Sequence, residues 1–255
     1  MLAGVYAAQK KDGTIYYRSN ITFHNKHISL GSFDTEQTAH EAYKEAGGIL
    51  VAKNVMPADC FRNRFALSYD KIVSLANFRD NGIYIKNPIY LRSNYFIYYL
   101  SVSEELKFDI DDLFFYSSHK ILKRQGHLYV NDYGMQLSIL SRYGIKNYAV
   151  AGRDYKFANG DPLDYRYSNI IVVNKYTGVT AVEKNGTTRY RVQIHLNGNH
   201  KIGTYSTEAK AAVAYNKAAD LAAAHGVCKN HTQNYVLELT AREYFSQIPG
   251  TLKAS

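Results

Sequence analysis

The stretch LGSFDTE at Leu30–Glu36 recurs further along the chain as IGTYSTE at Ile202–Glu208, at an offset of 172 residues. A Gly-Val pair lies upstream of each stretch, at Gly4 and at Gly178. An alanine-rich segment follows each stretch at the same offset, with Ala39, Ala42, Tyr43 and Ala46 in one and Ala211, Ala214, Tyr215 and Ala218 in the other. Because small residues recur in step with larger ones, the sequence indicates two copies of one module.

Each copy is predicted to form three strands and then a helix. Asp12–Gly13 and Asn185–Gly186 are hairpin-turn signals, and each precedes a run in which two sets of residues alternate, as in a strand with one buried face. One face takes Tyr17, Ser19, Ile21 and Phe23 in the first copy and Tyr190, Val192, Ile194 and Leu196 in the second. The opposite face takes Arg18, Asn20 and Thr22, and Arg191, Gln193 and His195. Asp34 and Ser206 are the expected helix N-caps.

Charge separates the predicted sheets from their helices. The chain has 31 Lys and Arg residues against 22 Asp and Glu, a net charge of +9. The strands of each copy have a net charge of +3, from Lys10, Lys11, Arg18 and Lys26 against Asp12, and from Lys184, Arg189, Arg191 and Lys201 against Glu183. The helices are negative in the first copy and balanced in the second. A basic sheet face opposite a helix-covered one favours a nucleic-acid surface over an ordinary solvated face.

These motifs resemble the AP2/ERF DNA-binding domain. The Gly-Val pair, the strand YRVQIH at Tyr190–His195, the IGTYSTE stretch and the helix segment AYNKAA at Ala214–Ala219 are similar to that family. The resemblance covers residues 3–50 and 176–225 and implies a sheet that enters the major groove of DNA. With the strand and turn cations added, the candidate DNA-binding residues are Lys10, Lys11, Arg18, Asn20, Thr22, Lys184, Arg189, Arg191, Gln193, His195 and Lys201.

The region between the copies resembles HNH homing endonucleases that end in an AP2 module. The resemblance rests on the segment NGDPLD at Asn159–Asp164, on Arg166 and on Ser168–Asn169, and on the order of the domains. The positions that would hold the catalytic residues of that family carry Ser138, Lys156, Phe157 and Tyr165 instead. An HNH nuclease needs an imidazole base and a divalent metal, so we expect no catalytic residues and no cofactor.

Two other functions compete with DNA binding without cleavage. The first is an active HNH-type nuclease that uses Mg²⁺ with relocated ligands, for which His119 and His127 are the nearby candidates. The second is a protein-interaction or inhibitor module that uses the former DNA surface. The preferred function is a regulator or DNA-protecting factor from a phage or mobile element, and duplex DNA is its expected partner.

The expected fold class is α+β, with two AP2-like modules, each a three-stranded antiparallel sheet plus a helix, around a central degenerate HNH domain of ββα type. The predicted order is a module at 1–53, a linker at 54–89 with a helix around 69–77, the HNH-like domain at 90–174, a second module at 175–226 and a helical tail at 227–255. No run of about 18 apolar residues is present, so no membrane association is expected.

Location is predicted from the same kind of evidence. The first residues lack the basic region and apolar core of a signal peptide. Cys60 and Cys228 lie too far apart for a zinc-type spacing and form no disulfide framework. We therefore expect an intracellular protein, in the cytoplasm of a bacterial cell, phage-infected or not, or in the nucleus of a eukaryotic one. The DNA target and the oligomeric state stay open.

Overall fold

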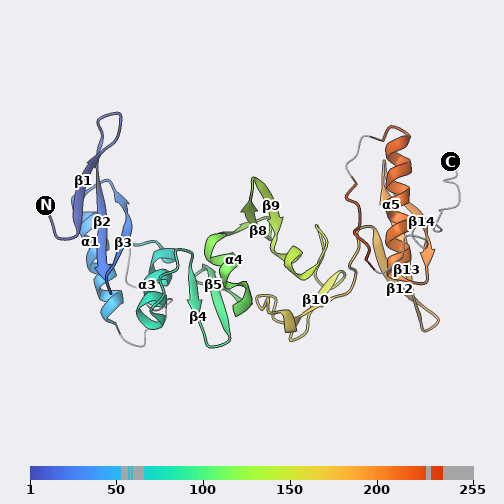
Figure 1. Ribbon diagram of the computed structural model, residues 1–255, viewed down its shortest axis with the longest axis horizontal. Helices are drawn as coiled ribbons and strands as arrows, with labels where there is room; N and C mark the ends of the chain where they lie inside the picture. Colours follow the sequence, from blue (N-terminus) through green and yellow to red (C-terminus); the bar gives the residue numbers. More distant parts are fainter. Residues whose placement is uncertain (53–56, 58, 60–65, 228–230, 238–255) are drawn as a thin grey trace. The chain divides into compact units, whose positions relative to one another are not determined.

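The computed structural model of the chain describes residues 1–52, 57, 59, 66–227 and 231–237 (Figure 1). These residues form mixed α+β structure, with five small antiparallel sheets and four α-helices among them. The chain divides into two compact units. The first unit comprises Met1–Leu137 and Asp161–Tyr167, and the second comprises Ser138–Gly160 and Ser168–Ser255. No helix among the described residues combines the length and the apolar character needed to cross a bilayer.

The first unit begins with a sheet covered by a helix, which we call the first module. Its strands are β1 (Val5–Gln9), β2 (Ile15–Phe23) and β3 (Lys26–Phe33), paired antiparallel in the order β1-β2-β3. Helix α1 (Glu36–Val51) packs on one face of this sheet through a row of buried alanines. The small alanine side chains let the helix lie close to the strands, as the sequence predicted.

The second unit contains the same arrangement, which we call the second module. Its strands are β12 (Val179–Lys184), β13 (Thr187–His195) and β14 (Asn199–Tyr205), again antiparallel and in chain order. Helix α5 (Glu208–Ala224) covers one face of the sheet with nine buried residues. Figure 1 shows this helix beside its three strands at the orange end of the chain.

Within each module, equivalent residues pair across the strands, and both sheets have a β-bulge at the same place. Val5 lies opposite Ser19 in the first module, and Val179 lies opposite Val192 in the second. The third strand of each module then gains one residue, Leu30 or Ile202, between two paired positions. A bulge at the same place in both sheets is a specific feature of the backbone, because it turns one extra side chain toward the core. The repeat in the sequence is thus a repeat in structure.

A close contact between a glycine and a tyrosine explains why these two residue types recur together. Gly4 has a φ of +75° and Gly178 a φ of +73°. A Cβ atom at Gly4 would lie 2.1 Å from the ring of Tyr43, and one at Gly178 would lie 2.1 Å from the ring of Tyr215. Both positions therefore require glycine twice over, for the left-handed backbone and for the approach of the ring.

The helix caps differ from the prediction by one residue. Thr35 and Thr207, not Asp34 and Ser206, are the N-caps, and the hydroxyl of each accepts a hydrogen bond from the backbone N–H three residues ahead. The backbone of each threonine is still extended, with φ near −130°. The preceding residue therefore lies too far from the free N–H groups of the first turn to accept from them.

The segment expected to be a linker is part of the core of the first unit. Its helix is present as α3 (Tyr69–Asn81), and seven consecutive residues of that helix, Ile72–Phe78, are buried. They pack in one cluster with residues of α1, of β3 and of β5 (Tyr95–Ser101). The Ser68 hydroxyl caps the start of α3 by accepting a hydrogen bond from the Lys71 N–H. Residues 66–81 are therefore no spacer between independent domains.

The remaining elements of the first unit are two small sheets and short helices. They are β4 (Ile89–Leu91), β6 (Glu104–Asp109), η1 (Ile110–Asp112), α4 (Leu113–Ser118), β7 (Ile121–Arg124), β8 (His127–Asp132) and β9 (Met135–Ser138). Strands β4, β5 and β6 form one sheet, and β7, β8 and β9 form another. Aromatic rings from β5, β6 and α4 stack in the first of these, including Phe96 on Phe108 at 5.5 Å between ring centroids.

The region with HNH resemblance forms a hairpin without the expected helix. Strands β10 (Tyr155–Phe157) and β11 (Ile170–Val172) pair antiparallel, with η2 (Ile139–Tyr143) before them and η3 (Tyr167–Asn169) between them. No α-helix is described between α4 and α5, so the ββα arrangement is not completed within this region. The chain after β11 reaches β12 within a few residues, which leaves no room for a helix there.

The tail after α5 is described only in part. Residues 231–237 form neither helix nor strand, and the rest of the expected helical tail at 227–255 lies largely outside the described residues. Asn234 holds this segment to the second module, since its backbone and side chain exchange hydrogen bonds of 2.7–3.1 Å with Asn216 of α5 and with Thr177.

A buried carboxylate ties the hairpin of the second unit to its module. The side chain of Asp154 is 1% exposed and forms ion pairs with Lys146 at 3.0 Å and Arg153 at 2.6 Å. Lys146 also donates to the carbonyls of Tyr176 and Val179 at the start of β12. Burial alone would raise the pKa of Asp154, but the Arg153 guanidinium, the Val150 N–H and the Lys146 ammonium together hold it below its ordinary value of 3.8.

Asp154→Asn is expected to lower the free energy of unfolding of the second unit by about 3 kcal/mol, because it leaves Lys146 buried without its counter-charge. The exposed partner gives a matched control, and Arg153→Ala is expected to cost less than about 1 kcal/mol. Because the pKa is lower in the folded state, the stabilisation by Asp154 is present at neutral pH and is lost as the pH falls below about 4. Chemical denaturation at several pH values measures this, and equal acid sensitivity of wild type and Asp154→Asn would contradict it.

Candidate nucleic-acid interface

The sheet of the second module has one face covered by α5 and one open face. Tyr190, Val192 and Ile194 point to the helix side and pack in the core of the module, as the alternation predicted. Their neighbours along β13, together with cross-strand partners on β12 and β14, point the other way. We call this open face of the second module the second open face. The candidate residues on it are Lys184, Arg189, Arg191, Gln193, His195 and Lys201.

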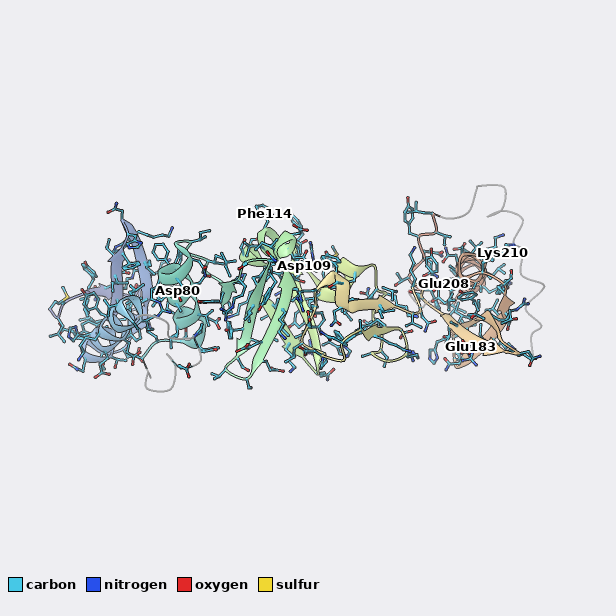
Figure 2. The ribbon with its side chains drawn as sticks, turned by 90° about the horizontal axis from the view of Figure 1, so that it is seen from below. Asp80, Asp109, Phe114, Glu183, Glu208 and Lys210 are labelled. Atoms are coloured by element: carbon cyan, nitrogen blue, oxygen red, sulfur yellow. The ribbon has the colours of Figure 1, made fainter. Side chains whose placement is uncertain are left out.

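This face has four cations and no carboxylate. The other residues that the strand register places on it are Thr180, Val182, Thr187, Asn199 and Thr204. Glu183, the one acid on these strands, has the opposite parity along β12 and points away from the face. Figure 2 labels Glu183 on the strand layer and Glu208 and Lys210 on α5. The charge counted over whole strands is therefore concentrated on one side of the sheet.

The four cations of the second open face have no carboxylate partner within the described part of the chain, in contrast to seven lysines and arginines of the region between the modules. In the region between the modules, lysines and arginines pair with carboxylates: Arg79 with Asp80, Lys107 with Asp161, Lys120 with Asp70, Lys123 with Glu104, Lys146 and Arg153 with Asp154, and Arg166 with Asp164. Among the described residues, no carboxylate pairs with Lys184, Arg189, Arg191 or Lys201. The face can therefore accept an anionic ligand without first breaking an internal ion pair.

Arg191 occupies the centre of this face. It lies on the middle strand, between Thr180 of β12 and Thr204 of β14. Its Nε atom is shielded from solvent and finds no hydrogen-bond partner among the described residues. A shielded donor without a partner is uncommon in folded proteins and calls for an explanation.

The sheet of the first module also has one face that α1 leaves uncovered, which we call the first open face. It is built in the same way as the second open face but is far less basic. Arg18, Asn20 and Thr22 lie on it, as predicted, while the buried Ser19 between them points to the helix side. The Arg18 guanidinium donates to the Tyr16 hydroxyl at 2.6 Å, and the Thr22 hydroxyl lies 3.3 Å from Nδ1 of His27. Arg18 is the only cation that the register of these strands places on the face.

The other cations of the first module lie at its turns. Lys10 and Lys11 are exposed in the β1–β2 turn, next to Asp12, whose carboxylate accepts from the Thr14 N–H at 3.0 Å. Lys26 lies at the β2–β3 turn, 5.5 Å from the centroid of the Tyr84 ring. The equal charge of +3 on the two sets of strands thus conceals different faces. The second module presents its charge on the sheet, and the first presents it mainly at the ends of the hairpins.

Three of the four positions expected to have lost catalytic residues have structural contacts. Ser138 caps η2 by accepting a hydrogen bond from the Leu140 N–H, and Phe157 packs in a small cluster of the second unit. Tyr165 is buried and stacks on Phe108 at 5.6 Å. Lys156 is exposed on β10. None of the four side chains supplies an imidazole or a carboxylate.

The residues that match the HNH motif also hold their own loop together. Asp164 is fully buried and receives two hydrogen bonds from Arg166, at 2.8 and 2.6 Å. The Asn169 side chain accepts from the Asn159 N–H at 2.8 Å. Asp161 pairs with Lys107 at 2.9 Å, and this hydrogen bond holds the pKa of Asp161 below its usual value. The motif is explained by the folding of the loop.

His119 and His127 do not form one site. Nε2 of His119 lies 3.3 Å from the Asp132 carboxylate, and its Nδ1 lies 2.9 Å from the Phe115 carbonyl oxygen. His127 is exposed on the β7–β8 hairpin, opposite Arg124. Within the part of the chain that the structure describes, no three His, Cys, Asp or Glu side chains are grouped as ligands of a metal ion would be.

Tyr6 and Tyr16 are two further residues of the first open face that the predicted set of DNA-binding residues did not include. Tyr6 lies on β1 directly opposite Arg18, and its side chain is 53% exposed. Tyr16 lies two residues before Arg18, on the same open face. The available signal was the parity of β2, which puts Tyr16 on the side of Arg18 and not with the buried set. For Tyr6, the sequence does not show which face of the sheet the side chain is on. That depends on how β1 pairs with β2, which only the structure gives.

Comparison of the chain with protein-family models, with curated proteins and with solved structures finds no match.

Proposed function

We propose that this chain binds double-stranded DNA through the second open face and does not cleave it. The observation that supports the proposal most is the set of four cations on that face, which have no carboxylate partners among the described residues. Phosphate contacts provide most of the affinity of proteins for DNA, and they need cations free to reach the backbone. The residues beside these cations, Gln193 and His195, offer hydrogen-bonding groups suited to base edges.

The resemblance to AP2/ERF domains supports the same proposal. In that family a three-stranded sheet with one helix behind it enters the major groove, and both modules have a sheet and helix of this kind. Arg191, Gln193 and His195 take the groove-facing positions in the second module. Arg18, Asn20 and Thr22 take them in the first, with Lys10 and Lys11 near the backbone. The first module is expected to add less to the affinity, since its face has one cation.

Descent from an HNH homing endonuclease that has lost its chemistry is part of the proposal. The loop Asn159–Asn169 keeps the residues that hold it in shape, and three of the four expected catalytic positions, Ser138, Phe157 and Tyr165, have packing or capping roles. A DNA-binding protein of this origin suits a regulator, or a factor that covers a site and protects it from another enzyme. Both roles need binding and no hydrolysis.

The test combines binding and cleavage on the same DNA. Without divalent metal, the chain is expected to shift a duplex of mixed sequence at low salt. With Mg²⁺ or Mn²⁺, it is expected to leave supercoiled plasmid intact over hours. Metal-dependent nicking that disappears in His119→Ala, while DNA binding persists, would contradict the absence of cleavage and establish the nuclease. Failure to bind duplex at low salt would contradict the proposal and favour a protein partner for the same face.

A further inference from the structure

The first open face differs from the second by presenting aromatic rings around one arginine. Tyr6 and Arg18 are cross-strand partners, so their side chains stand next to each other on the sheet. The guanidinium carbon of Arg18 lies 5.4 Å from the centroid of the Tyr16 ring, and the same group donates to the Tyr16 hydroxyl at 2.6 Å. We call Tyr6, Tyr16 and Arg18 the aromatic platform.

The platform is open to solvent. Tyr6 is 53% exposed, Arg18 is exposed and Tyr16 is half-buried. Ala8 lies across from Tyr16, so a small side chain stands beside the ring on the neighbouring strand. The rings of Tyr6 and Tyr16 therefore leave surface available to a ligand beside Arg18.

The chemistry of the platform suits unpaired bases. A planar guanidinium and tyrosine rings on an open sheet offer flat surfaces on which successive bases can stack, and every base has such a face. A short single strand needs only a few cations to bind its phosphates. Lys10 and Lys11 lie at the end of the β1–β2 hairpin, next to the platform, and have no ion pairs among the described residues. In a duplex, by contrast, the faces of the bases are covered by their neighbours and one arginine would have to hold the backbone.

We propose that the first open face binds single-stranded nucleic acid by stacking unpaired bases on Tyr6, Tyr16 and Arg18. This goes beyond the proposed function, in which the second open face provides most of the affinity for duplex DNA and the first open face adds little. The two copies of the module then have different ligands, and one chain can hold a duplex and an unpaired strand. The difference follows from the side chains on two sheets of the same register.

The chain has no tryptophan, which allows a direct optical test in the full-length protein. The Tyr6→Trp variant has a single tryptophan on the platform, and stacking of a base on it quenches its fluorescence. Titration with an oligothymidine strand of about 20 nucleotides is expected to quench this fluorescence with the same midpoint as the anisotropy of a labelled strand. Tyr133→Trp, at a residue that is 97% exposed in the β8–β9 turn of the same unit, is the matched control and is expected to show no quenching.

Affinities of variants complete the test. Tyr6→Ala is expected to weaken binding of the single strand about tenfold, whereas Tyr6→Phe keeps the ring and the affinity. Binding of a duplex by either variant is expected to stay within about twofold of wild type, since the second open face is unchanged. Single-strand binding without quenching in Tyr6→Trp, or with equal affinity in Tyr6→Ala, would overturn the inference. If the wild type binds the single strand but not the duplex, the result would contradict the proposed function and not the inference about the first open face.

Discussion

Replacing both Arg189 and Arg191 by alanine is expected to lower the affinity for duplex DNA about 100-fold at moderate salt. Both side chains lie on the middle strand of the second module, and both are without carboxylate partners among the described residues. Their removal therefore weakens the attachment to DNA and breaks no internal ion pair. Each arginine that reaches a phosphate or a base contributes about 1–3 kcal/mol, and the two together give the expected loss.

A control with the same change of net charge separates direct binding from long-range attraction. The double variant Lys120→Ala and Lys123→Ala also removes two positive charges, but these lysines pair with Asp70 and Glu104 on the surface of the first unit. It is expected to weaken duplex binding less than about threefold. Fluorescence anisotropy with one duplex measures both variants. Equal losses would mean that net charge and not the second open face governs the binding.

Gly178→Ala is expected to destabilise the second module by about 3 kcal/mol, the largest loss of stability that we expect from removal or addition of a single methyl group. The positive φ of Gly178 costs a side chain about 1 kcal/mol. The new Cβ would also lie 2.1 Å from the Tyr215 ring, which is buried and has to move, at a further cost of about 2 kcal/mol. Gly4→Ala in the first module is expected to act in the same way against Tyr43.

Gly186→Ala isolates the cost of the backbone from that of the clash. Gly186 has a φ of +69°, and its added Cβ would meet no atom within 4 Å. It is expected to cost about 1 kcal/mol. Hydrogen exchange resolved to peptides of residues 178–224 measures both variants on the second module alone. Similar losses for Gly178→Ala and Gly186→Ala would show that the packing of glycine against tyrosine is not a constraint of this fold.

The repeat made the two modules predictable. Gly4, the turn at Asp12–Gly13, the alternation along residues 17–23 and the alanine stripe each specify local geometry, and all agree on three strands and a helix. The alternation also gave the open-face positions of Arg18 and Arg191. The N-caps were missed by one residue because Asp34 and Ser206 are as good caps by type as the threonines that follow them.

Long-range pairing limited the rest of the prediction. The burial of α3 depends on strands and a helix far away in the sequence, so a short helix between two modules looked like a linker. Tyr6 lies on a short strand, and only its pairing with Arg18 shows that its side chain is on the open face of the sheet. The HNH-like segment matched by residue type, yet Asp164 and Asn169 serve the loop itself. A motif shows which residues are present, and their contacts decide what they do.

The salt dependence of duplex binding tests the central claim most directly. Each phosphate that the protein neutralises contributes about −0.9 to the slope of log K against log salt concentration. If Lys184, Arg189, Arg191 and Lys201 each neutralise one phosphate, the slope for the wild type is about −3.6. We expect such a slope for the wild type, and a slope smaller in magnitude by about 2 for the Arg189→Ala and Arg191→Ala double variant. A slope near zero, or one that the double variant leaves unchanged, would contradict binding of DNA through the second open face.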